Sequence, residues 1–219
     1  MIRLFTGQNP AFCESREHPA TNFSAPAPGP YTVPLLPCDK FTHMSKPYRT
    51  QRPAPGTYSD YFQPYIDQVP EGDILQTLAA NLDAVPAFFE ALPSGKWDYR
   101  YAPDKWTPKD ILQHLIDTER VFSYRALRIA RSDTTPLPSF DENLFAREAF
   151  AGRRHPEALL AEYRAVRTST LFLYLDLPDE AWLRQGQAGG GVLTPQAVAW
   201  CLAGHELHHL DVLRTRYLD

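Results

Sequence analysis

Cysteine is scarce in this sequence. Its three cysteines, Cys13, Cys38 and Cys201, lie far apart and match neither the disulfide framework of a small secreted domain nor a zinc-binding spacing. No apolar segment is long enough to span a bilayer, and the N-terminus lacks the apolar core of a secretory signal. We therefore expect a cytoplasmic protein with no membrane partner.

Positive charge is not in excess either. The chain has 22 lysines and arginines against 26 aspartates and glutamates, which gives a net charge of -4 and a pI of about 6.0. Proteins that bind the phosphates of nucleic acids carry a basic surface. We therefore expect no nucleic-acid partner.

Proline is abundant but unevenly distributed. Of the 21 prolines, 12 fall within the first 70 residues, where no helical or strand periodicity is found. We predict that residues 1–57 form a Pro-rich, largely irregular extension and that residues 58–219 form one folded domain. Because Met44 resembles a natural start, we expect residues 1–43 to be disordered or absent from the native protein.

Beyond this region the apolar residues recur every three or four positions, which is typical of helices with one buried face. Threonine followed by proline, at 107–108 and 194–195, indicates two of the helix starts. The pattern predicts four helices, at about 73–92, 107–131, 155–177 and 194–217. We expect no strand, and we interpret the glycine-rich segment 186–191 as a flexible connector.

The joints between these helices are short, except for the 132–154 connection between the second and the third. A long connection of this kind crosses over the bundle. The sequence therefore predicts an all-α four-helix bundle with one crossover connection. A short amphipathic piece at 143–150 is expected to cover one end of it.

Two histidines near the C-terminus share one helix face. His205 and His209 are four residues apart on an apolar stripe, so both imidazoles can reach one metal ion. A third ligand is expected from upstream, where His114 faces inward from the second helix. Three neutral imidazoles would leave positions open for water or substrate. Two alternatives remain: His114 is an ordinary hydrogen-bonded core residue, or His208 is a ligand in place of His209.

The segment from His205 to His209 also matches the H-E-x-x-H pattern of zinc proteases, in which Glu206 would act as the base. We disfavour this interpretation. The longer form of the motif needs glycine and histidine where this chain has Val212 and Thr215, and the ten residues after His209 are expected to leave no room for a third ligand.

Other polar residues are candidates for roles around the metal. We predict Asp117 and Glu206 as catalytic acid or base. The alternative for Glu206 is a role in supporting a metal ligand or in helix capping. Residues further along the second helix could bind an anionic substrate, namely Glu119, Arg120, Tyr124 and Arg125. The alternative for this second group is an ordinary salt-bridge network on a helix flank.

Five motifs, in order and with matching gaps, resemble the DinB-like (DinB/YfiT) superfamily over about residues 58–218. They occupy residues 99–108, 114–122, 125–127, 138–143 and 203–209. The resemblance implies an up-down-down-up four-helix bundle, a divalent metal ion and frequent dimerisation. It places the metal ligands at His114, His205 and His209.

Members of the family include proteins described as metal-dependent hydrolases and transferases or isomerases that use a small thiol such as bacillithiol or mycothiol. We therefore expect a metal-dependent hydrolase or small-thiol S-transferase that acts on a small molecule. One divalent ion is expected, zinc or nickel in the first place, with iron, manganese and copper also compatible. The alternative is a stress-associated bundle that binds metal without catalysis. An open metal position in a deep pocket would favour the enzyme.

Overall fold

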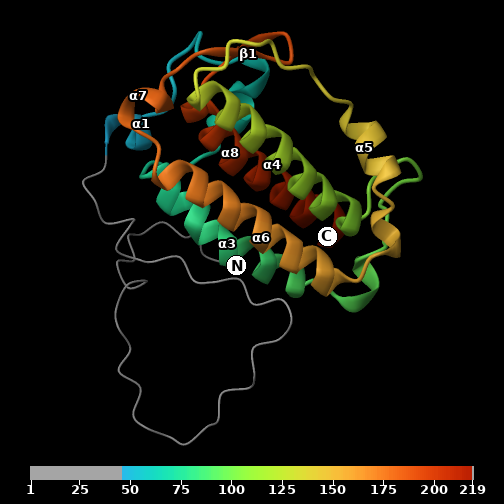
Figure 1. Ribbon diagram of the computed structural model, residues 1–219. Helices are drawn as coiled ribbons and strands as arrows, with labels where there is room; N and C mark the ends of the chain where they lie inside the picture. Colours follow the sequence, from blue (N-terminus) through green and yellow to red (C-terminus); the bar gives the residue numbers. More distant parts are fainter. Residues whose placement is uncertain (1–45, 219) are drawn as a thin grey trace, which may run out of the picture.

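The computed structural model describes residues 46–218, so the prediction for residues 1–43 lies outside the described residues. Four long helices pack side by side in a bundle (Figure 1). They are α3 (Ile74–Glu90), α4 (Pro108–Ala130), α6 (Pro156–Leu175) and α8 (Pro195–Leu213). The predicted all-α four-helix bundle is confirmed.

Capping side chains explain where these helices begin. Asp73 and Thr194 each accept hydrogen bonds from backbone N–H groups in the first turn of α3 and α8. Thr107 and Asp110 form a reciprocal capping box at the start of α4. These side chains satisfy N–H groups that have no partner within the helix. At the other end of the chain, α8 continues into a π-helical turn, Arg214–Leu218.

The chain runs in one direction along α3 and α8 and in the opposite direction along α4 and α6 (Figure 1). Side-chain contacts agree: Glu119 and Ser123 of α4 contact Arg167 and Thr170 of α6 in the same order, so these helices are parallel. The topology is therefore up-down-down-up, as the resemblance implied.

Parallel neighbours need a connection that returns along the bundle. Here it contains α5 (Glu142–Glu148) and a 3-10 turn, Ala151–Arg153, both of which contact α4. The predicted crossover and its short helix are confirmed.

The glycine-rich segment expected to be a flexible connector instead forms a β-hairpin. Strands β1 (Gly186–Ala188) and β2 (Gly191–Leu193) pair antiparallel across Gly189 and Gly190, whose φ angles of 62° and 85° favour glycine. Backbone hydrogen bonds join this hairpin to Leu137 of the crossover. The prediction of no strand was wrong because three-residue strands are too short to show alternation.

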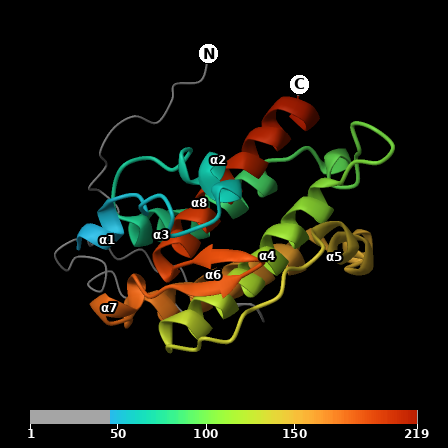
Figure 2. The same ribbon diagram turned by 90° about the horizontal axis from the view of Figure 1, so that it is seen from above.

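Short helices before α3 pack on the outside of the bundle. In α1 (Pro47–Thr50), Arg49 forms a buried ion pair with Asp73, so α1 packs on the start of α3. The following α2 (Gln63–Ile66) lies against α8 (Figure 2). The remaining short helices are α7 (Asp179–Trp182) and two 3-10 turns, Asp60–Phe62 and Ser94–Lys96.

The core consists of two apolar clusters, one toward each end of the bundle. The first includes Leu78, Phe122, Leu171 and Leu202, and the second includes Val85, Leu115, Leu159 and Leu210. In each of the four long helices, polar residues separate the part that belongs to one cluster from the part that belongs to the other. Among residues 46–218, no helix has both the length and the apolar character needed to cross a membrane.

Candidate metal centre

Three histidine side chains from two helices meet at one cavity. The Nε2 atom of His205 lies 3.0 Å from that of His114 and 3.0 Å from that of His209. One ring nitrogen from each histidine lies within 4.8 Å of the other two. The structure thus brings together the three residues predicted as metal ligands, with α4 supplying one and α8 two.

The imidazoles are held in the neutral form that a metal ligand requires. Burial lowers the pKa of His114 to about 4, and burial together with the neighbouring His114 and His208 lowers that of His209 to about 3. The pKa of His205 is lowered well below its ordinary value, first by burial and then by the other histidines. At neutral pH each ring therefore offers a lone pair.

One hydroxyl supports the orientation of the first histidine. Thr118 Oγ1 lies 3.4 Å from His114 Nδ1, one helical turn further along α4. A proton on Nδ1 directed at this hydroxyl leaves the Nε2 lone pair free to face His205.

A glycine in α8 determines how closely α2 approaches the site. A Cβ atom on Gly204 would lie 1.9 Å from the backbone oxygen of Tyr65, so a larger residue would force α2 away. At this distance the Tyr65 ring packs edge-on against His205 and His208, with centroids 5.4 Å apart in both pairs. Gly204 therefore allows α2 to form one wall of the cavity.

The cavity has a volume of about 490 Å³ and reaches from the histidines to the hairpin. Its walls are largely aromatic, formed by Tyr61, Phe62, Tyr65, Trp106, Phe122 and Phe140. Polar groups are interspersed among them, chiefly Ser59, Thr118, Arg125, Ser139, Glu142, Cys201 and His208. Burial raises the pKa of the Cys201 thiol to about 12, so this thiol is protonated and not a nucleophile at neutral pH.

His208, the alternative to His209 as a ligand, also lines the cavity. It packs against the rings of Tyr65 and His209 but is not one of the three histidines whose nitrogens converge. The geometry thus favours His209.

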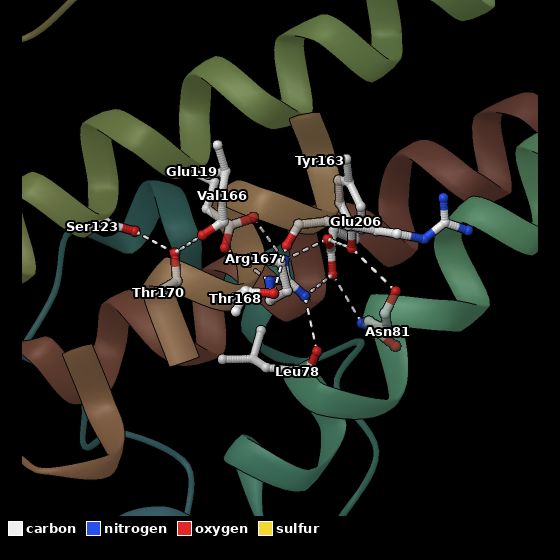
Figure 3. Close-up of polar contacts among 11 residues, drawn as sticks. Leu78, Asn81, Glu119, Ser123, Tyr163, Val166, Arg167, Thr168, Thr170 and Glu206 are labelled. Carbon is white, nitrogen blue, oxygen red and sulfur yellow. Dashed lines mark hydrogen bonds and ion pairs between the residues drawn. The ribbon is translucent and has the colours of Figure 1, made fainter. Parts of the chain in front are cut away.

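Glu206 and Glu119 lie in a separate network inside the bundle (Figure 3). The guanidinium of Arg167 donates to both oxygens of each carboxylate, at 2.5–3.2 Å. Tyr163 and Asn81 complete the partners of Glu206. Neither glutamate lines the cavity, so their placement argues against the catalytic role predicted for Glu206 and the substrate contact predicted for Glu119.

Three more of the predicted residues lie on the outer flank of α4. Asp117 accepts from Gln113 and pairs with Arg120, which also pairs with Glu162; burial raises the pKa of Asp117. Tyr124 is exposed. Asp117 and Arg120 thus belong to a salt-bridge network of the kind considered as the alternative. Of the four predicted substrate-binding residues, only Arg125 lines the cavity.

Sequence reasoning assigned no role to Tyr65, Trp106 or Phe140, although all three line the cavity. Trp106 packs beside the ligand candidates, with its ring centroid 4.7 Å from that of His114. A glycine in the middle of an otherwise regular helix was the available signal, because it often marks a close approach by another segment.

These features define a class of protein, a four-helix bundle in which histidines from facing helices line a cavity. The chain belongs to the DinB superfamily, whose family model matches residues 77–213. It is also similar in fold to YfiT from Bacillus subtilis, described as a probable metal-dependent hydrolase with an unusual four-helix bundle topology. The identity is 18%, the TM-score is 0.57, and the match covers 78% of this chain and 95% of YfiT. No curated protein matches the chain.

Proposed function

We propose that His114, His205 and His209 bind one divalent metal ion and that the protein is a metal-dependent enzyme acting on a small molecule. The observation that carries this proposal is the convergence of three neutral imidazole nitrogens on one cavity. Hydrolysis and transfer to a small thiol are the two reactions proposed. The description of YfiT supports the former.

The nitrogen positions fit an ion. Nitrogen ligands about 2.0–2.1 Å from a metal are roughly 2.9–3.4 Å apart at bond angles of about 90–110°. The two Nε2 separations of 3.0 Å fall within this range. Three imidazoles suit zinc or nickel, and these are the metals that we propose.

The donor set favours an enzyme over a storage or structural protein. Structural zinc sites are closed by four protein ligands, whereas catalytic sites use three and keep a position open. Among residues 46–218 no fourth histidine, cysteine or carboxylate joins the group of three.

The chain's own residues would bind and orient the substrate. A bound divalent ion supplies Lewis-acid activation of a water or a thiol. The aromatic walls exclude bulk water and hold an apolar substrate, while Thr118 maintains the orientation of His114. Cytoplasmic location and dimer formation are further proposals about the same protein.

Metal content tests the first part of the proposal. Purified protein should hold about one divalent ion per chain by elemental analysis, and His114→Ala and His209→Ala should lose most of it. His208→Ala is the matched control and should retain the ion. Full occupancy in both ligand variants would contradict the assignment.

Turnover tests the second part. The metal-loaded protein is incubated with ester and amide substrates, and separately with small thiols and electrophiles, while product or loss of free thiol is followed. We expect one of these reactions to depend on the bound metal and to be lost in His205→Ala. A protein that holds its ion and shows no metal-dependent reaction would support the non-catalytic alternative.

A further inference from the structure

Arg125 differs from the other buried arginines of the described chain. It is 5% exposed and lines the cavity, yet it forms no ion pair with any residue in 46–218. Its one hydrogen bond within residues 46–218 is from Nη2 to the backbone oxygen of Pro138, at 2.7 Å. By contrast, Arg49 is paired with Asp73, and Arg167 with two glutamates.

An unpaired buried guanidinium is unfavourable unless something compensates its charge. The Arg125 guanidinium has five N–H donors, and only one group in residues 46–218 accepts from it. Each Arg125 nitrogen that lacks a hydrogen-bond partner is still in contact with solvent, so its free N–H donors remain accessible. They are available to a ligand in the cavity.

We propose that Arg125 is the anion-binding end of the substrate site and that the substrate is an organic carboxylate with an apolar body. This inference rests on the proposed function in one respect, namely that the other end of the substrate reacts at the histidines. The anion-binding role itself depends on the surroundings of Arg125.

The surroundings of Arg125 specify both halves of this ligand. Its guanidinium carbon lies 5.1 Å from the ring centroid of Phe122 and 5.7 Å from that of Phe140, so an apolar body would lie against aromatic walls. Among residues 46–218, one arginine and one carboxylate, Glu142, line the cavity, and no ion pair joins the two. A single unpaired cation matches a monoanion better than a phosphate dianion.

The distance along α4 separates the two ends of the ligand. Arg125 follows His114 by eleven residues, which corresponds to about 16 Å between their backbone positions along the helix axis. Arg125 and His114 thus enter the same cavity from positions about three turns apart on α4, so we assign the carboxylate to Arg125 and the reacting bond to the histidines.

Phenylacetate and its neutral analogue phenylacetamide test the proposal, because they have nearly the same shape and differ by one charge. Binding of each to metal-loaded and metal-free protein is measured by calorimetry at pH 7, and metal content is determined on the same samples. We expect phenylacetate to bind about 10- to 100-fold more tightly, with or without the metal.

Arg125→Met should remove this preference while metal content stays at the wild-type value, and Arg125→Lys should restore part of it. Arg131→Met, which removes an exposed arginine at the end of the same helix, should leave it unchanged. Thermal unfolding by circular dichroism checks that each variant is folded.

The possible failures are distinct. A preference that persists in Arg125→Met and disappears on metal removal means that the carboxylate binds the ion, and it overturns the role of Arg125. An equal affinity for both compounds in wild-type protein also overturns it. Loss of metal binding in the wild type would contradict the proposed function but not the preference measured in metal-free protein.

Discussion

The bundle has two buried polar clusters that differ in how their polar groups are satisfied. The open cluster consists of His114, His205 and His209, and the closed cluster consists of Glu119, Arg167 and Glu206. His205 and Glu206 are neighbours on α8, but His205 faces the cavity and Glu206 faces the interior between the two apolar clusters. Glu206 receives hydrogen bonds from Arg167, Tyr163 and Asn81. His205, in contrast, meets other histidine nitrogens that are equally neutral.

The difference shows that burial and charge alone do not mark a functional group. All five N–H donors of Arg167 have acceptors, namely two glutamates and the backbone oxygen of Leu78 (Figure 3). Such a network is closed to a ligand. The histidine cluster keeps lone pairs directed at a cavity, and it is therefore the site that can bind something.

The largest effect is expected from breaking the closed cluster. Arg167→Met leaves Glu119 and Glu206 buried without their cation, which should lower the free energy of unfolding by about 3–5 kcal/mol. Urea denaturation of the metal-free protein measures it. Adding Glu119→Gln and Glu206→Gln should recover part of the loss, because the unpaired charges are then removed.

Arg164→Met is the matched control on the same helix. Arg164 pairs with Glu90 at the surface, where the side chains are 32% and 51% exposed, and its loss should cost less than about 1 kcal/mol. Equal losses in the two variants would mean that the buried network is no more important than a surface pair.

The second effect concerns the open cluster and should appear in metal binding instead of stability. His114→Ala, His205→Ala and His209→Ala should each weaken metal binding by at least about 100-fold, equivalent to about 2.7 kcal/mol. Their metal-free forms should unfold within about 1 kcal/mol of wild type, because these rings face a cavity and few core contacts are lost. Metal titration and urea denaturation of the same samples separate the two quantities. A large loss of metal-free stability would place the histidines in the structural class with Arg167.

The open cluster was predictable from the sequence, whereas the closed one was not. Histidines four residues apart on an apolar stripe, with His114 inward-facing on another predicted helix, can be found from helical periodicity. Arg167 gives no such signal, because an arginine in a helix is ordinarily exposed and its partners come from other helices. The sequence therefore did not indicate that Glu119 and Glu206 share this arginine.

The cavity walls were beyond the sequence for a different reason. Tyr65 belongs to a four-residue helix that has no measurable periodicity, and its place depends on contact with a distant part of the chain. The helix starts, by contrast, depend on local capping residues such as Thr107 and Asp110, so they were predicted correctly.

A third, smaller effect is expected where α2 packs against α8 and forms one wall of the cavity. Gly204→Ala places a methyl group against the backbone of Tyr65, which cannot rotate away, and should lower the free energy of unfolding by about 2 kcal/mol. Displacement of α2 should also alter the cavity and weaken binding of small ligands. Gly95→Ala, which meets nothing within 4 Å, is the control and should be nearly neutral. If Gly204→Ala is equally neutral, α2 is not held against α8 by close packing.

The smallest effect distinguishes a hydrogen bond to the closed cluster from an ordinary buried one. Burial raises the pKa of Tyr163 well above its ordinary value, so its hydroxyl donates to Glu206 at 2.6 Å at neutral pH. The Tyr174 hydroxyl donates instead to the neutral backbone oxygen of Pro195, at 2.8 Å. Hydrogen bonds to charged acceptors contribute more than those to neutral ones. Tyr163→Phe should therefore lower the free energy of unfolding by about 1.5 kcal/mol and Tyr174→Phe by about 1 kcal/mol, as measured by urea denaturation. The difference should vanish when each change is made separately in a Glu206→Gln protein. A difference that survives in that background would show that the charge of Glu206 does not strengthen the bond.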